Sequence, residues 1–339
     1  MKFFISMLLF SFLFVSTLTA KDYTKKYEVR LFIDQMVRKH KCSRSKLNKL
    51  FRNAKFQRKA LAIYIPSLRP KVHPSKVVKR KKQGSWDRYE GVFLKESKVD
   101  KGVKYMRKHR RTLQRAYQKY GVQPEYITAI IGIESHYGVN TGKFPVFDTL
   151  TTLAFEENRR KRFYKSELKA FLLMTKREKL NPKNIKGSYA GAIGLGQFMP
   201  SNYRAYVVDF NGDGRKRMNH SEDAIGSIAY YIKRHGWKRG EPVAVRVSYP
   251  GTRYRGRQTG YKHKYSRASL KGINPKENFD YSGKVHLIKL KRYSFDELWY
   301  GTKNFRVITR YNHSNYYAMA VYQLADRIKK GYKRRYGTI

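Results

Sequence analysis

Apolar residues recur at helical spacing along most of the chain. Over residues 27–65 they return every three or four positions, as at Ile33 and Met36, which predicts two or three amphipathic helices. Gly121 and Pro124 mark the end of one later helix and the start of the next. The further predicted helices cover residues 102–120, 124–138, 164–180, 201–210, 223–235 and 315–330.

The pattern changes between residues 241 and 300. The segments V-A-V-R-V and V-H-L-I-K-L alternate apolar and polar positions, with Gly and Pro between them, which predicts short strands. Residues 66–83 carry three prolines before a Lys/Arg cluster and are predicted to form a loop. We therefore expect a mainly α protein of the α+β class with a small β insertion.

The first twenty residues have the pattern of a signal peptide. Lys2 is followed by an apolar run to Leu18 and by the small residue Ala20. We predict an exported, periplasmic protein that is soluble or peripherally attached, with no transmembrane segment after signal cleavage; because Leu18 is larger than is usual at its position, an uncleaved anchor is the alternative. Cys42 is the single cysteine, so a lipoprotein Cys after the cleavage site is not expected.

The charge balance is strongly positive. The chain has 75 Lys and Arg against 24 Asp and Glu, a net charge of +51. Such a charge suits polyanions, and nucleic acid is the usual one. Outside the cytoplasm we expect anionic envelope polymers instead, and no nucleic acid; solvation of helix faces is the plainer explanation of the same residues.

Glu134 is the most unusual carboxylate. It lies near the end of an apolar helix, with Ile130 and Ile131 on the same face. Desolvation and the negative end of the helix dipole both raise a carboxyl pKa, as a general acid near neutral pH requires. The alternative is a Glu134 paired with Lys or Arg, and spacing alone does not separate the two.

A glycine-rich segment over residues 187–203 supplies neutral polar groups among aromatic residues. Gly191, Gly194 and Gly196 permit tight turns, while Ser188 and Gln197 offer hydrogen-bonding groups. This combination suits a sugar, which has hydroxyl groups and flat apolar faces. An ordinary turn between helices is the alternative.

Together these segments resemble a known family. I-E-S-H-Y-G around Glu134, G-S-Y-A-G-A-I-G-L-G-Q-F-M-P-S, D-F-N-G-D-G, D-A-I-G-S-I-A-Y-Y and Y-N-H-S-N-Y-Y-A-M-A-V-Y follow the order of the lytic murein transglycosylase B family. The resemblance covers nearly all of the mature chain. It implies a lysozyme-like catalytic core with an N-terminal helical domain and a small inserted β domain. The expected division is signal peptide 1–20, helical domain 21–123, core 124–240, β insertion 241–300 and a core-completing segment 301–339.

The resemblance also implies an activity on peptidoglycan glycan strands. Glu134 matches the catalytic acid, which protonates the glycosidic oxygen between N-acetylmuramic acid and N-acetylglucosamine. It then takes the proton of the muramic C6 hydroxyl as a 1,6-anhydro ring closes, so no water is consumed and no second catalytic carboxylate is needed. A muramidase that hydrolyses the same bond and a non-catalytic basic wall-binding protein are the alternatives. The substrate-binding positions implied are Ser188, Gln197, Tyr311, Asn312, Tyr317, Arg159 and Arg160.

The segment D-F-N-G-D-G-R-K-R-M-N-H-S-E-D resembles the family's calcium loop. No cofactor is required by the implied chemistry, and a structural calcium is possible. Position 12 is His220 in place of the usual Glu, and three cations at 215–217 repel a divalent ion. The ligands implied are Asp209, Asn211, Asp213, Arg215 through its carbonyl, and Asp223.

Overall fold

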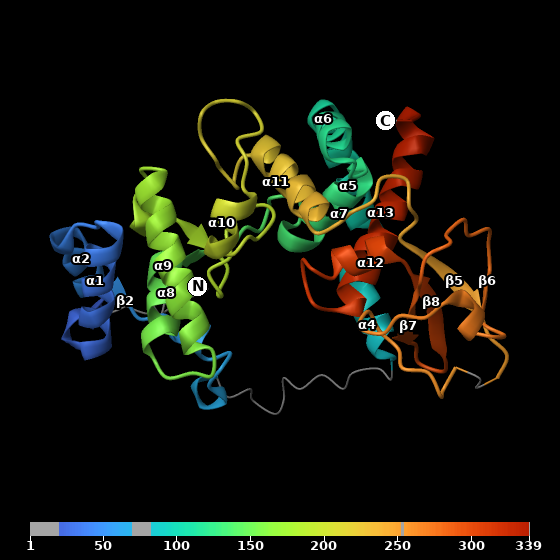
Figure 1. Ribbon diagram of the computed structural model, residues 1–339. Helices are drawn as coiled ribbons and strands as arrows, with labels where there is room; N and C mark the ends of the chain where they lie inside the picture. The colour runs from blue at the N-terminus through green and yellow to red at the C-terminus, as the bar shows by residue number, and fades with distance from the viewer. Residues whose placement is uncertain (1–19, 70–82, 252–253, 339) are drawn as a thin grey trace, which may run out of the picture. The chain divides into compact units, whose positions relative to one another are not determined.

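The computed structural model describes residues 20–69, 83–251 and 254–338 (Figure 1). The chain divides into two compact units. Unit 1 contains residues up to 69 together with 148–165, and unit 2 contains residues 70–147 and 166–339. The predicted signal peptide lies outside the described residues but for its last position, and so does most of the predicted 66–83 loop, which begins with a 3-10 turn at Pro66–Leu68.

Unit 1 is built from short helices around a cluster of aromatic rings. The rings of Phe32, Phe51 and Phe155 meet edge to face at 5.7–6.0 Å. The predicted helices of the 27–65 segment are confirmed. Its elements are β1 Ala20–Lys21, α1 Tyr27–His40, α2 Arg44–Arg52, β2 Ala54–Lys55, α3 Arg58–Leu61, most of α8 Val146–Phe155 and the start of α9 Lys161–Arg177.

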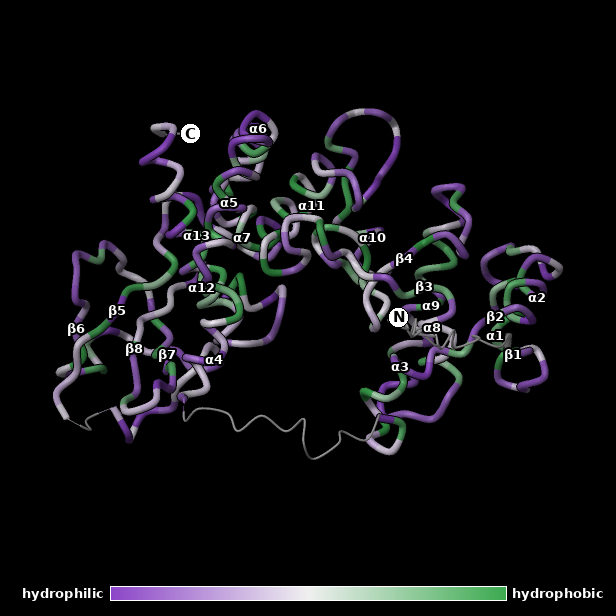
Figure 2. The backbone as a smooth tube through the Cα atoms, turned by 180° about the vertical axis from the view of Figure 1, so that it is seen from behind, coloured by the Kyte–Doolittle hydropathy of each residue, from purple (hydrophilic) through white to green (hydrophobic). Residues whose placement is uncertain are grey.

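Unit 2 contains most of the helices. α13 packs on α7 and α5, and α11 packs on α6. Hydrophobic and hydrophilic residues alternate along these helices (Figure 2), as expected of amphipathic elements. They are α4 Ser85–Phe93, α5 Glu96–Lys108, α6 Arg110–Tyr120, α7 Pro124–Ser135, the rest of α9, α10 Pro200–Tyr206, α11 Ser221–Arg234, α12 Lys303–Ile308 and α13 Asn315–Tyr336.

Several helix predictions need correction. The helix expected over residues 201–210 ends at Tyr206, because Val207 is extended at φ −80° and ψ 126°, and the helix expected to end at Lys330 continues to Tyr336. The single helix expected over residues 102–120 is two helices, because His109 leaves helical geometry at φ −106° and ψ 20° and packs its ring 4.4 Å from Tyr105. The helix expected to reach Gly138 ends at Ser135. There His136 adopts a left-handed conformation, φ 53°, and the N–H of the following residue, Tyr137, donates to the Ile131 carbonyl at 3.3 Å.

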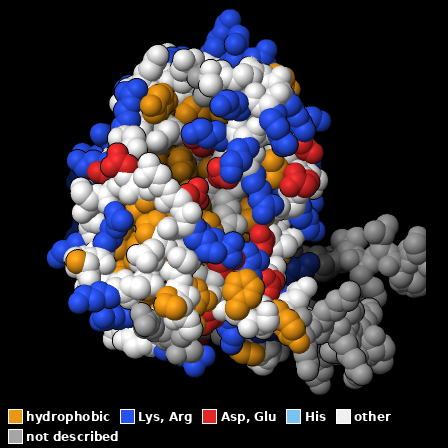
Figure 3. Space-filling view, turned by 90° about the vertical axis from the view of Figure 1, so that its right-hand side faces the viewer, with side chains coloured by type: hydrophobic (Ala, Val, Ile, Leu, Met, Phe, Trp, Pro, Cys, Tyr) orange, Lys and Arg blue, Asp and Glu red, His pale blue; other side chains and the backbone are white. Residues whose placement is uncertain are grey.

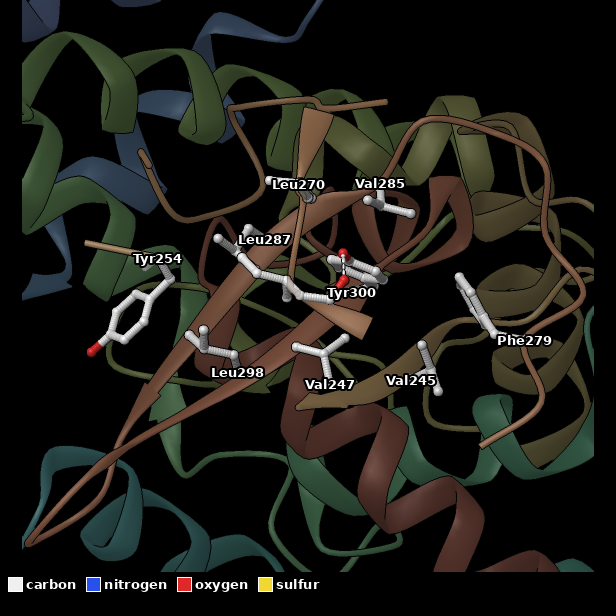
Figure 4. Packing of buried hydrophobic residues seen from close by; sticks show 10 residues of the cluster. Val245, Val247, Tyr254, Leu270, Phe279, Val285, Leu287, Leu298 and Tyr300 are labelled. Atoms are coloured by element: carbon white, nitrogen blue, oxygen red, sulfur yellow. Dashed lines mark hydrogen bonds between the residues drawn. The ribbon is translucent and has the colours of Figure 1, made fainter. Parts of the chain in front are cut away.

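The β segment forms a four-stranded antiparallel sheet in the order β6-β5-β8-β7. The strands are β5 Ala244–Ser248, β6 Asn274–Pro275, β7 His286–Lys291 and β8 Asp296–Gly301. The two predicted strands, β5 and β7, are confirmed, and β6 and β8 are additions. One face of the sheet covers a hydrophobic cluster that includes Val247, Leu287, Leu298 and Tyr300 (Figure 4). A separate antiparallel pair consists of β3 Phe144–Pro145 and β4 Lys186–Gly187, and Gly187 is also the first residue of the glycine-rich segment.

Across the described parts of the chain, no helix combines the length and the apolar character needed to cross a bilayer.

Candidate active site

Glu134 lies in the last turn of α7, and the rest of that helix explains why it is there. Pro124 occupies the first helical position, where the N–H it lacks is not needed. Ile127, Ile130 and Ile131 are completely buried. Because the helix is apolar nearly all round, packing on both sides fixes it and brings the Glu134 carboxyl group into low-dielectric surroundings.

Within the part of the chain that the structure describes, one side-chain hydrogen bond holds the Glu134 carboxyl group. Tyr317 Oη donates to Glu134 Oε1 at 2.6 Å. Burial raises the pKa of Glu134 to about 7, and the Tyr317 hydrogen bond opposes that rise. Among the described residues no Lys or Arg forms an ion pair with this carboxylate, so the ion-paired alternative does not account for it. The group is therefore half protonated near neutral pH and can act as an acid and as a base.

Two stacked tyrosines lie beside Glu134. The rings of Tyr311 and Tyr317 are 6.3 Å apart and nearly parallel. Ser314 accepts the N–H of Tyr317 at 3.3 Å and so caps α13, which fixes Tyr317 in its first turn. Tyr311 Oη donates to the Gly196 carbonyl at 2.5 Å. This bond joins the start of α13 to the glycine-rich segment.

The glycine-rich segment has the tight backbone that its composition predicts. Gly191 and Gly194 have φ values of 84° and 76°, and a Cβ at Gly196 would lie 2.8 Å from Tyr311 Oη. Ser188 Oγ accepts the Ala192 N–H at 3.0 Å. Gln197 Nε2 donates to the carbonyls of Thr141 at 3.0 Å and Gly194 at 2.8 Å. Both side chains brace the segment, and their sugar contacts stay a prediction.

The other predicted substrate residues fall into two groups. Asn312 is exposed immediately after Tyr311. Arg159 and Arg160 belong to unit 1, where both are exposed. The Arg160 guanidinium lies 4.0 Å from the Phe163 ring centre and that of Arg159 6.0 Å from the Tyr64 ring centre. The structure therefore brings Glu134, Tyr311, Tyr317 and the glycine-rich segment together and leaves the arginine pair as a prediction.

Tyr89 is a neighbour of Glu134 that the sequence interpretation missed. Burial and the negative charge of Glu134 raise the pKa of Tyr89 to about 12. Its ring lies 5.7 Å from Tyr316, the residue before Tyr317. Tyr89 stands on α4, which was not predicted, although Trp86, Tyr89 and Phe93 follow one another at spacings of three and four and would have indicated it.

The 209–223 loop is organised by its carboxylates. Asp223 is completely buried and accepts the backbone N–H groups of Phe210 and Arg217, both at 2.8 Å. Asp209 accepts those of Gly212 at 2.8 Å and Gly214 at 2.7 Å. Side chains and N–H groups of the loop therefore close it without an added ion.

Asp213 has a cation of its own. Arg217 pairs with it, and Asn211 Nδ2 donates to the same carboxylate at 3.0 Å. The Asn211 hydrogen bond, an N–H and Arg217 lower the Asp213 pKa. The oxygen donors of this loop fit calcium by type. Within the described residues, however, no three His, Cys, Asp or Glu side chains converge as metal ligands do.

Three comparisons with known proteins bear on this site. Residues 24–326 match the family model described as the transglycosylase SLT domain. The chain is 39% identical over 314 residues to the membrane-bound lytic murein transglycosylase B of Escherichia coli (strain K12), covering 91% of this chain and 84% of that protein.

The similar solved structures agree. The Escherichia coli lytic transglycosylase SLT35, solved in complex with bulgecin A and with calcium, has a TM-score of 0.83 at 38% identity, covering 93% of this chain and 96% of that one. SltB3 from Pseudomonas aeruginosa, in complex with NAG-anhNAM-pentapeptide, has a TM-score of 0.72 at 26% identity, covering 89% and 78%. These neighbours have the lysozyme-like fold expected from the sequence.

Proposed function

The chain belongs to the transglycosylase SLT domain family, and we propose that it cleaves the glycan strands of peptidoglycan with Glu134 as the acid and base. It is a lytic transglycosylase, as its relatives are. The observation that carries the assignment of Glu134 is a desolvated carboxyl group whose pKa is raised to about 7 and whose hydrogen-bond partner among the described residues is the Tyr317 hydroxyl. The predicted division into domains at residues 123, 240 and 300 remains part of this proposal.

The reaction uses one carboxyl group twice. Protonated Glu134 gives its proton to the glycosidic oxygen as the bond from that oxygen to C1 of N-acetylmuramic acid breaks. The C6 hydroxyl of the same sugar then attacks C1, and its proton returns to the Glu134 carboxylate. The products are an N-acetylglucosamine end with a free hydroxyl and a 1,6-anhydro end, and the enzyme regains its starting protonation state.

Tyr317 has a distinct task in this cycle. Its hydroxyl donates to Glu134 Oε1 at 2.6 Å, and a donor to a carboxylate favours the ionised form. The bond therefore stabilises Glu134 after its proton has been transferred, while burial favours the protonated form before transfer. Burial and the Tyr317 hydrogen bond together set the pKa of Glu134 at about 7, so the group can first donate and then accept a proton.

Substrate contacts are assigned to the residues around this pair. We propose that Ser188, Gln197, Tyr311 and Asn312 hold the sugars. Arg159 and Arg160 carry fixed charges suited to the carboxylates of stem peptides. Since the NAG-anhNAM-pentapeptide in SltB3 contains sugars and a peptide, both kinds of contact suit a substrate of that class.

Calcium is proposed as a weakly bound structural ion. Asp209, Asn211, Asp213 and Asp223 would hold it with the Arg215 carbonyl, and a relative has been solved with calcium. The ion must compete with Arg217 for Asp213. Bound calcium supplies positive charge to the loop and takes no part in bond cleavage.

Export to the periplasm is also part of the proposal. It depends on the signal-peptide pattern of residues 1–20 and on the substrate, which lies outside the cytoplasm. The positive surface then meets anionic polymers of the envelope. Figure 3 shows Lys and Arg side chains spread over the face on the β-sheet side, with few carboxylates between them.

Digestion of purified peptidoglycan tests the function. Wild type should release muropeptides with 1,6-anhydro ends, detected by mass spectrometry, and Glu134→Gln should lower their yield about 10²–10⁴-fold, the usual contribution of a general acid. Glu96→Gln, whose side chain is 80% exposed, is the matched control and should digest normally. Reducing ends would indicate a muramidase, and equal results for wild type and Glu134→Gln would indicate a binding protein.

A further inference from the structure

The turn of the β7–β8 hairpin exposes two aromatic rings. Lys291 pairs in register with Asp296, and the Arg292 N–H donates to the Phe295 carbonyl at 2.9 Å, so Tyr293 and Ser294 form the turn. Tyr293 is 64% exposed and Phe295 is 51% exposed. Large rings exposed side by side form the kind of apolar patch that marks a binding surface.

Phe295 lies between two hollows. One has a volume of about 340 Å³ and the other of about 210 Å³, and Phe295 lines both. The first is lined also by Tyr249, Tyr254, Arg255, Lys291 and Tyr293. The second is lined also by Arg246, Ser248 and Lys276. Together they form an aromatic and cationic surface at the β7–β8 turn and along the neighbouring strand β5, which we call the hairpin surface.

The carboxylates of the hairpin surface are already neutralised. Glu297 is 5% exposed and pairs with Arg292 at 3.0 Å and with Arg246 at 3.6 Å. Asp296 accepts the Tyr254 hydroxyl at 2.6 Å and pairs with Lys289 at 3.6 Å. Their negative charge is therefore not available to a ligand.

Its remaining cations are free of ion pairs. Lys276, Arg255 and Lys291 are exposed, and none of them pairs with a carboxylate within the described parts of the chain. The hairpin surface thus presents positive charge beside flat rings. This combination favours a ligand that has flat apolar faces and carboxylates.

The hairpin is fixed to the helices that surround Glu134. Arg292 pairs with Asp87 of α4 at 3.0 Å, and a Cβ at Gly84 would lie 2.3 Å from the Lys291 carbonyl oxygen, so the two backbones touch. The Lys291 N–H donates to Tyr316 Oη at 3.3 Å. α4 carries Tyr89, and Tyr316 precedes Tyr317 on α13. The hairpin surface therefore holds a fixed position relative to the catalytic residues.

We propose that the hairpin surface is a second, non-catalytic binding site for the peptidoglycan strand. The proposal rests on the function proposed above, because it takes the same polymer as ligand. Sugar rings would stack on Tyr293 and Phe295, while stem-peptide carboxylates pair with Lys276, Arg255 and Lys291. Two hollows separated by a ring suit a chain of sugars better than they suit a flat bilayer.

Cosedimentation with purified, insoluble peptidoglycan tests the site. All variants are made in the Glu134→Gln chain, so that the polymer is not digested. Tyr293→Ala with Phe295→Ala should weaken binding about tenfold, and Lys276→Ala with Arg255→Ala should weaken it and reduce its salt dependence. Tyr27→Ala removes a ring that is 66% exposed on α1 and is the matched control. Thermal unfolding checks that each variant is folded.

The outcomes separate this site from the catalytic proposal. Anhydro products from wild type, with undiminished binding by the Tyr293/Phe295 variant, would overturn the hairpin surface and leave the function standing. Weaker binding by that variant and not by Tyr27→Ala supports the site even if the products were reducing ends. If the Tyr293/Phe295 variant sedimented less with anionic phospholipid vesicles but bound peptidoglycan as wild type does, the surface would bind membranes and the proposal would be refuted.

Discussion

Unit 2 keeps carboxyl groups in two opposite environments. Glu134 is held among isoleucines and tyrosines with one hydroxyl donor, and its pKa rises to about 7. The carboxylates of the 209–223 loop receive backbone N–H groups from several sides, and Asp213 receives a guanidinium as well. Asp223 is completely buried, whereas Glu134 as a residue is only partly buried although its carboxyl group is desolvated. The two carboxyl groups also differ in their donors, because backbone N–H groups reach Asp223 and a tyrosine hydroxyl reaches Glu134.

The two environments have different consequences for stability. Ionisation of a buried carboxyl group with few hydrogen-bond donors lowers the stability of the folded state. Such destabilising surroundings are common for catalytic groups. A buried carboxylate with many donors stabilises the loop around it. Substitutions that remove the carboxyl group should therefore have effects of opposite sign at the two places.

The largest effect is expected at Asp223. Asp223→Ala leaves the N–H groups of Phe210 and Arg217 without an acceptor, and we expect a loss of about 4 kcal/mol in the free energy of unfolding. Urea unfolding in EDTA at pH 7 measures it. Glu222→Ala, next in sequence and paired with Arg115 at the surface, should cost less than about 1 kcal/mol. Equal losses for the two variants would contradict the role of Asp223.

At Glu134 the sign is reversed. The folded pKa of about 7 lies above the ordinary value of 4.5, so the folded state holds the proton more tightly and stability falls as pH rises from 4.5 to 7. Above pH 7 the cost reaches about 3 kcal/mol. Glu134→Gln should therefore be more stable than wild type by up to that amount at pH 8, and about equal to it at pH 4.5.

Urea unfolding of both proteins at the two pH values measures this difference. Glu96→Gln, at an exposed position, should show no such pH-dependent gain. A Glu134→Gln variant that is less stable than wild type at pH 8 would show that ionised Glu134 is not strained by burial.

The sequence predicted the parts of this comparison that depend on local pattern. An apolar helix with one Glu at its end is visible in the residues from Ile127 to Glu134, and the loop at Asp209 was expected from its resemblance to the family's calcium loop. The helix and the loop can both be recognised in the sequence because the residues that form each of them lie within a few positions of one another. The family resemblance gave Tyr317 as a substrate-binding position, but its hydrogen bond to Glu134 was not predicted, since the two residues are 183 positions apart.

What was missed depends on contacts between distant segments. Trp86, Tyr89 and Phe93 keep helical spacing and would have indicated α4, but no local pattern shows that Tyr89 on it lies near Glu134. β8 begins with Asp296 and Glu297, which obscure the alternation of Leu298 and Tyr300, and its pairing with β7 fixes it as a strand. The break at His109 interrupts no apolar period, because Met106 and Leu113 continue the same buried face.

A smaller effect is expected when the Tyr317 hydroxyl, which donates to Glu134, is removed. The Tyr317 hydroxyl lowers the pKa that burial raises, so Tyr317→Phe should move the alkaline limb of kcat/KM to higher pH by up to about one unit. The pH profile of anhydro-product formation measures the limb. Tyr316→Phe, whose hydroxyl bonds Ser85 and not Glu134, should leave the limb in place. A Tyr317→Phe limb at lower pH would refute the balance described here.

The smallest effect is expected at Arg217, whose guanidinium pairs with Asp213 in the 209–223 loop. Arg217→Asn frees Asp213 from its internal cation, so calcium should bind several-fold more tightly than to wild type and should raise the melting temperature more. Calorimetric titration with calcium and melting with and without EDTA provide the two readouts. Lys216→Asn removes the same charge but forms no ion pair with Asp213 within the described loop, and it should tighten calcium binding less. If both variants tighten it equally, only the net charge of the loop matters. If neither variant binds calcium more tightly than wild type, Arg217 does not compete with calcium. The loop carboxylates would then differ from Glu134 only in the backbone N–H groups that they accept.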